Sequence, residues 1–166
     1  MTFVFDDVSV PSTKYVFGEN EPNLSQIGKY TFAFAYDYIS LKGGTLCFDN
    51  EIIPKDDYHE LYYLKQEISS VKIVDLFTKK PHQYRFHSID YSSKRDWLFK
   101  KLAKAIGVTY KNAQQRDQLP TIYQIAVYTD EKTRTAPRIV GFFGNYGIFH
   151  LIFFDYSHSI YPNSLN

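Results

Sequence analysis

The pattern of hydrophobic positions is clearest in the last third of the chain, where it predicts three consecutive β-strands. The apolar runs cover residues 122–129, 138–143 and 148–154. Between the second and third runs, the four residues GNYG supply the flexibility that a hairpin reversal needs. The third run is apolar on both of its faces, which is typical of a central strand covered on both sides. The pattern therefore predicts a C-terminal, antiparallel three-strand meander.

One further strand is predicted in the first half of the chain. In residues 29–39, Tyr and Phe side chains alternate with small or polar ones, and a period of two residues indicates a β-strand. The turn Gly43-Gly44 follows, and the segment 45–49 is a candidate to pair back as a short strand. We therefore expect this region to add to the sheet.

Two helices are expected after this strand. Asp56 or Asp57 caps the first of them, with Glu60 completing a capping box, and apolar residues then recur at helical spacing. The second helix lies within 71–80 and ends before Pro81.

A third helix begins at Ser93 and ends at Gly107, after an extended segment that carries Arg85 and His87. Its apolar stripe consists of Leu98, Leu102, Ala105 and Ile106. Lys94, Arg95, Lys101 and Lys104 lie off this stripe, so the helix is expected to show a basic face to solvent.

These elements together predict an α+β fold, in which helices pack on one face of an antiparallel sheet. With 166 residues, of which 44% are hydrophobic, the chain is long enough for one well-formed core. We expect a single domain over 1–166, made of an N-terminal arm (1–28) and a core (29–162) with an insertion at about 90–120.

Charge adds a candidate nucleic-acid surface. The net charge of +1 indicates no general affinity for polyanions, but the segment 94–116 holds seven basic residues and one acid. On the third helix, Lys94, Arg95, Lys101 and Lys104 are the candidate nucleic-acid-binding residues. A solvated lysine face is the alternative explanation of the same pattern.

Several classes of site are not indicated. The single cysteine, Cys47, excludes an intrachain disulfide and a cysteine-based zinc cluster. His150 lies among apolar residues and is expected to be a core histidine, so we expect neither a metal nor a cofactor. No apolar run approaches the length of a membrane span, and a cytoplasmic protein without membrane contact is the expectation.

The order of elements and the ending RIVGFF…IFHLIFFDYSHSIYP resemble the RelE/ParE-type toxin superfamily. The segments YRFHSID and R-x-x-G-F…F-F-D-x-x-H-x-x-Y-P also resemble small proteins of bacterial mobile elements and defence islands. The resemblance covers roughly residues 30–162. It implies a RelE-like fold with an insertion, ribosome-associated RNA cleavage without a metal, and an antitoxin protein as partner. Arg138, His158 and Tyr161 match the basic, His and Tyr positions that the resemblance implies for the site, with Arg85 as a further basic candidate.

Residue chemistry is consistent with such a site. RNA cleavage without a metal needs a base, an acid and cations that stabilise the transition state. His158 is suited to acid–base work, Asp155 can orient it, and Arg138 can hold a phosphate. Antiparallel pairing across the GNYG turn places Arg138 at the same sheet edge as the tail that carries His158. Tyr161 can act as an acid or stack on a base, and His87 is a further candidate beside Arg85.

Each of these residues also has a structural interpretation. Asp155 can cap a turn and leave His158 exposed, and Tyr161 can close the core. Arg138 can form a salt bridge at the strand edge. Arg85 and His87 can pair with Asp90 or Glu60.

The first functional hypothesis is therefore a RelE-like toxin or effector that binds RNA and acts as a metal-independent endoribonuclease. The alternative is a non-enzymatic protein-interaction module of a phage or bacterial defence system, using a tyrosine-rich surface. A housekeeping fold with lost activity is a third hypothesis. An enzyme should gather the candidate catalytic residues in one basic concavity, whereas a binding module should scatter them and expose a flat aromatic patch. The oligomeric state is not predicted.

Overall fold

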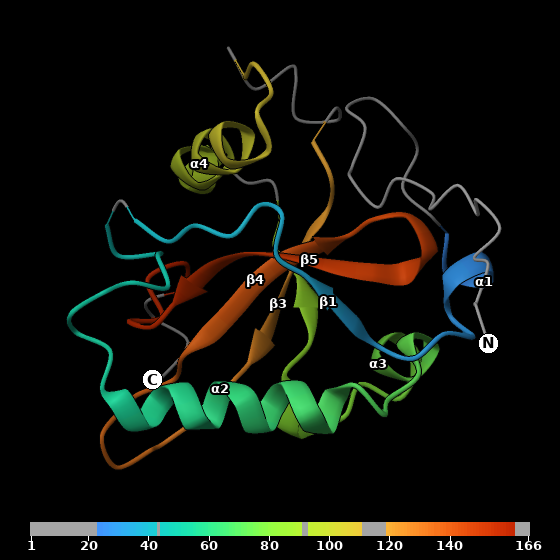
Figure 1. The fold of residues 1–166 in the computed structure, drawn as a ribbon, viewed down its shortest axis with the longest axis horizontal. Coiled ribbons are helices and arrows are strands. Elements are labelled where there is room, and N and C mark those ends of the chain that lie inside the picture. Colours follow the sequence, from blue (N-terminus) through green and yellow to red (C-terminus); the bar gives the residue numbers. More distant parts are fainter. Residues whose placement is uncertain (1–22, 43, 91–92, 111–118, 162–166) are drawn as a thin grey trace, which may run out of the picture.

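A computed structural model describes residues 23–42, 44–90, 93–110 and 119–161. The N-terminal arm up to residue 22, and residues 91–92 and 111–118 of the expected insertion, lie outside the described residues. The fold is α+β (Figure 1). Its helices and strands, in chain order, are α1 (Leu24–Ile27), β1 (Ala33–Ala35), α2 (Lys55–Ile68), α3 (Ile73–Thr78), β2 (His87–Ser88), α4 (Asp96–Ile106), β3 (Ile122–Ala126), β4 (Arg138–Phe143) and β5 (Ile148–Asp155).

The five strands form a mixed sheet in the order β1-β5-β4-β3-β2. β4 lies between β3 and β5 and runs antiparallel to both, and β2 runs antiparallel to β3. At the opposite edge, β1 runs parallel to β5. The expectation of a wholly antiparallel sheet is therefore wrong, because the edge strand β1 runs in the same direction as its neighbour β5.

The strand expected at 29–39 is reduced to Ala33–Ala35. The residues just before it bond outside the sheet: the Phe32 amide donates to the Val71 carbonyl oxygen at 3.0 Å, and the Ile73 amide donates to the Tyr30 carbonyl oxygen at 3.0 Å. The alternating pattern thus predicted a strand longer than the observed one, because residues 28–30 form a turn and a bend and residues 37–38 form a turn. Residues 45–49 form turns and bends, and the expected short strand there is wrong.

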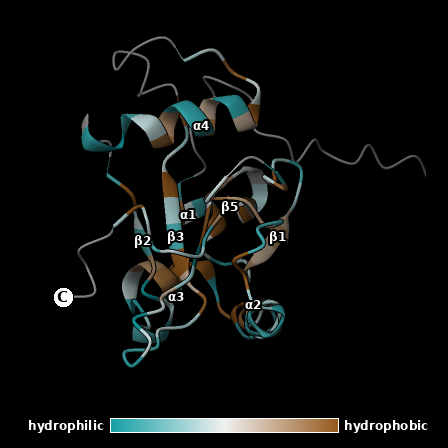
Figure 2. Cartoon of the chain, turned by 90° about the vertical axis from the view of Figure 1, so that its left-hand side faces the viewer, coloured by the Kyte–Doolittle hydropathy of each residue, from teal (hydrophilic) through white to brown (hydrophobic). Residues whose placement is uncertain are grey.

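Helices cover both faces of the sheet (Figure 2). One core contains Leu61, Leu64 and Ile68 of α2, Ile73 and Leu76 of α3, and Ile139, Phe143, Phe149 and Leu151 of the sheet. The other contains Leu98, Phe99, Leu102 and Ala103 of α4, with Ile122, Val140, Phe142 and Ile152 of the sheet. The expectation of helices on one face is therefore wrong. Because β4 and β5 are apolar on both sides, the second face also needs a cover, and α4 supplies it.

The helix ends agree only in part with the sequence patterns. α2 begins after Pro54 without a side-chain cap, so the expected capping box is wrong. The Asp57 carboxylate instead accepts a hydrogen bond from the Tyr128 hydroxyl at 2.8 Å. α4 ends at Gly107, whose φ of 76° is readily adopted by glycine. Among the described helices, none is long and apolar enough to cross a membrane.

Candidate functional site

The end of the sheet where β4 begins and β5 ends borders a cleft of about 290 Å³, here called the histidine cleft. The residues that line it are Lys80, His82, Arg85, Phe86, His87, Gln124, Arg138 and His158. Four of the six candidate catalytic residues are among them: Arg85, His87, Arg138 and His158. Arg138 lies opposite Asp155 in the β4–β5 register, which brings the C-terminal tail to this edge.

Arg138 is a buried cation of the histidine cleft, with a side chain only 2% exposed. Its Nη1 donates to the carbonyl oxygens of Tyr128 and Pro137, both at 3.0 Å, and its Nη2 donates to the Thr129 hydroxyl at 3.4 Å. Burial, followed by the nearby charge of Arg85, lowers the pKa of Arg138 to about 10. The guanidinium therefore stays charged at neutral pH.

Two buried polar atoms at this cleft have no hydrogen-bond partner among the described residues. They are Nε of Arg138, a donor, and Oε1 of Gln124, an acceptor. Buried polar groups of folded proteins are nearly always paired, so each such atom calls for a specific explanation. Both atoms are shielded from solvent beside the cleft, and a ligand that reached them would need an acceptor for Arg138 Nε and a donor for Gln124 Oε1.

The tail places His158 in the cleft by means of Asp155. The Asp155 carboxylate accepts hydrogen bonds from the Ser159 amide at 2.7 Å, the Ser159 hydroxyl at 2.8 Å and the Ile160 amide at 2.9 Å. Asp155 thus caps the turn that carries His158, which is the structural role considered for it from the sequence. His158 is only 4% exposed, contrary to the structural interpretation that left it in solvent. Burial, assisted by the charge of Arg138, lowers the pKa of His158, so its imidazole is neutral near pH 7.

His87 is an exposed imidazole at the other side of the cleft, on β2. Its Nδ1 lies 2.9 Å from the carbonyl oxygen of Arg85. A carbonyl oxygen only accepts, so Nδ1 carries the proton and Nε2 of the neutral ring is the acceptor. The β2–β3 pairing places His87 opposite Gln124, which fixes its position relative to the sheet.

The backbone around the cleft is locally strained. Five non-glycine residues of the described chain have positive φ, and three of them line this cleft: Lys80 (44°), Arg85 (42°) and His158 (52°). A left-handed conformation costs an L-residue about 1–2 kcal/mol. Such strain persists only where surrounding packing imposes it, and it concentrates at functional sites.

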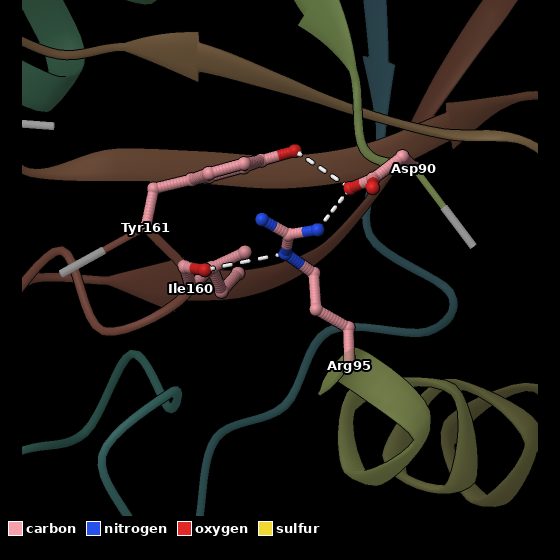
Figure 3. Close-up of polar contacts among 4 residues, drawn as sticks. All are labelled: Asp90, Arg95, Ile160 and Tyr161. Atoms are coloured by element: carbon pink, nitrogen blue, oxygen red, sulfur yellow. Dashed lines mark hydrogen bonds and ion pairs between the residues drawn. The ribbon is translucent and has the colours of Figure 1, made fainter. Parts of the chain in front are cut away.

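Tyr161 and Arg95 form a clamp beside the cleft, together with Asp90 (Figure 3). Arg95 pairs with the Asp90 carboxylate, donates from Nε to the Ile160 carbonyl oxygen at 3.3 Å, and lies 4.1 Å from the Tyr161 ring centroid. The Tyr161 hydroxyl donates to Asp90 at 3.4 Å, and the Tyr161 and His87 rings are steeply inclined to each other with their centroids 5.6 Å apart. One face of Tyr161 is therefore occupied, and Arg95 is engaged in holding the tail rather than presented for a phosphate.

The remaining candidate nucleic-acid residues diverge. Lys94 is exposed at the start of the helical segment, whereas Lys101 and Lys104 line a second cleft beside α4. Lys100, which directly precedes Lys101 in the sequence, pairs with Asp96 at 3.0 Å. The basic side chains of this helical segment therefore do not form one continuous basic surface: some line a cleft, one is exposed, and others are engaged in ion pairs.

Sequence reasoning missed Phe86 and three polar residues of the histidine cleft: Lys80, His82 and Gln124. A signal existed for each of them. The segment KKPHQYRFH concentrates basic and imidazole side chains, and Gln124 is a polar residue within an apolar strand. The expected core histidine, His150, is fully buried and stacks on Phe142 with ring centroids 5.0 Å apart. No group of metal ligands occurs among the described residues.

Comparison with known proteins gives no match to any family model, curated protein or solved structure.

Proposed function

We propose that this chain binds RNA and cleaves it in the histidine cleft without a metal ion. The observation that supports the proposal is the convergence of three cationic side chains (Lys80, Arg85, Arg138) and three imidazoles (His82, His87, His158) in one cleft, whose described lining includes no acid. Clustered cations attract a phosphodiester, and imidazoles transfer protons near neutral pH.

The arrangement suits attack by the ribose 2′-hydroxyl on the adjacent phosphorus. Neutral His158 takes the 2′-hydroxyl proton as general base, because its lowered pKa keeps it unprotonated near pH 7. The 2′-oxygen bonds to phosphorus while the bond from phosphorus to the 5′-oxygen breaks. His87, in its imidazolium form, donates the Nε2 proton to that leaving oxygen. The products are a 2′,3′-cyclic phosphate and a 5′-hydroxyl.

The other residues of the cleft supply charge and recognition. Arg85 and Arg138 stabilise the negative charge that builds on the non-bridging phosphate oxygens. RNA also provides donors for the buried Gln124 Oε1, in its ribose hydroxyls and exocyclic amines. The ligand class therefore complements both unpaired atoms of the cleft.

In the cell, we propose that the chain acts as a RelE-like toxin or defence effector restrained by an antitoxin. Expression from a tightly controlled promoter tests this idea, with growth and the integrity of cellular RNA measured together. Wild type should arrest growth and fragment RNA, His158→Ala should do neither, and His59→Ala, an exposed histidine on α2, should behave as wild type. Growth arrest with intact RNA would contradict the proposal, as would equal RNA fragmentation by the His158 variant.

A specific surface favours the alternative, a protein-interaction module. Tyr36, Tyr62 and Tyr63 are 45%, 65% and 62% exposed, and Lys65 lies 4.6 Å from the Tyr36 ring and 4.9 Å from the Tyr62 ring. Exposed tyrosines are common anchors of protein interfaces. If this surface carries the function, effects on growth should survive His158→Ala and disappear in a Tyr62→Ser/Tyr63→Ser variant.

A further inference from the structure

A second cleft, here called the lysine cleft, lies between residues 37–46 and α4. Its volume is about 320 Å³, and its lining includes Tyr38, Leu46, Phe153 and the side chains of Lys42, Lys101 and Lys104. This volume falls within the range of small-molecule sites. The lysine cleft follows β1, whereas the histidine cleft contains His87 of β2, so the two sites lie toward opposite edges of the sheet.

The charge of the lysine cleft favours an anion. Three ammonium groups face one acid in its described lining, Asp37, and the Asp37 carboxylate lies 3.7 Å from the Nδ1 of buried His150. No ion pair joins Lys42, Lys101 or Lys104 to a carboxylate elsewhere in the described chain, whereas Lys100 of the same helix pairs with Asp96. Lys101 and Lys104 come from α4 and Lys42 from the opposite wall, so the cations approach from two sides.

The apolar part of the lysine cleft favours a planar group next to that anion. Leu46 and Phe153 are buried, and the half-buried Tyr38 ring is held against Phe142 at 5.7 Å and His150 at 5.3 Å between centroids. An aromatic ring fixed by packing is a suitable surface for a nucleobase, because every base has a flat face. Lysines bind phosphate as mobile point charges.

We propose that the lysine cleft binds a nucleotide, with its phosphate on Lys42, Lys101 and Lys104 and its base against Tyr38. The nucleotide is either free or part of an RNA strand, since both present the same chemistry. The proposal does not depend on cleavage in the histidine cleft.

Equilibrium binding to the full chain tests the proposal, with ATP, GTP, inorganic phosphate and a 12-residue RNA as separate probes. To prevent turnover, the RNA arm uses His158→Gln as the background. Lys101→Gln/Lys104→Gln should weaken nucleotide binding about tenfold or more, because the double variant removes two of the three ammonium groups that hold the phosphate. Lys100→Gln should have no such effect, because Lys100 is engaged with Asp96.

The probes separate the two sources of the nucleotide. If Lys101→Gln/Lys104→Gln weakens the binding of ATP or GTP, the ligand is a free nucleotide. If it weakens only the binding of RNA, the lysine cleft is a subsite for an RNA strand. Tyr38→Leu should weaken the affected nucleotide probe and leave binding of inorganic phosphate unchanged. Equal weakening by Lys100→Gln, or unchanged binding of all probes in the double variant, would overturn the proposal. RNA that remains uncleaved by wild type would affect only the function of the histidine cleft.

Discussion

His158 couples the stability of the fold to pH. Burial lowers the pKa of His158 in the folded chain below the usual value of 6.5, so the unfolded chain binds a proton at a higher pH than the folded chain does. The free energy of unfolding should therefore fall as the pH drops from 6.5 toward the folded pKa, and this contribution should level off below it. Urea unfolding of wild type and His158→Asn over about pH 5–7.5 measures the effect. The variant should show the shallower pH dependence, and identical slopes would contradict the burial of a titrating His158.

Substitution of Arg138 is expected to lower the stability of the fold, whereas substitution of Arg85 is expected to weaken RNA binding. Arg138 is buried and holds two carbonyl oxygens, so Arg138→Ala should lower the free energy of unfolding by about 2–4 kcal/mol. Arg85 is exposed, so Arg85→Gln should leave stability nearly unchanged and weaken RNA binding severalfold. Denaturant unfolding and RNA titration check the pair, and an Arg138→Ala chain as stable as wild type would contradict this account.

At the scale of the elements, Gly141 permits the close approach of β4 and β5. A Cβ atom at this position would lie 2.2 Å from the His150 carbonyl oxygen and 2.6 Å from the Phe149 ring. Gly141→Ala should therefore lower the free energy of unfolding by about 3 kcal/mol, as overpacking of a well-packed core does. Gly107→Ala is the control, because a Cβ there meets no atom within 4 Å and only the positive φ adds a cost, of about 1–2 kcal/mol. Equal losses in thermal or denaturant unfolding would contradict this packing argument.

The elements themselves were predictable where the signal was local. The residues of β4 and the end of α4 at Gly107 follow from apolar runs and turn residues that lie next to each other in the chain. The parallel pairing of β1 with β5 joins Ala33 to Ile148, more than a hundred residues away, and no local pattern specifies it. The need for a cover on the second face was signalled by a β5 segment that is apolar on both sides. The helix that supplies it was also predicted, from its apolar stripe, but no local pattern assigned that helix to this face.

At the scale of the molecule, only the part of the candidate site that contains Arg138 and His158 was predictable from the sequence. The turn between β4 and β5 implies that Arg138 lies beside the tail of His158. The other half reaches the cleft through the pairing of His87 with Gln124, which a two-residue strand does not reveal in sequence. Tyr161 lies beside the cleft and not in it. The Arg95 guanidinium packs over its ring, and its hydroxyl donates a hydrogen bond to the Asp90 carboxylate.

The most direct test of the central claim is the chemistry of RNA cleavage by the purified chain in excess chelator. We expect fragments that end in 2′,3′-cyclic phosphate and begin with a 5′-hydroxyl, identified by mass spectrometry. His158→Gln and His87→Gln should each slow their formation by about 100-fold or more, the usual scale for loss of one acid or base, whereas His59→Gln should not. Intact RNA with wild type, or cleavage that both cleft variants sustain at the wild-type rate, would contradict the account.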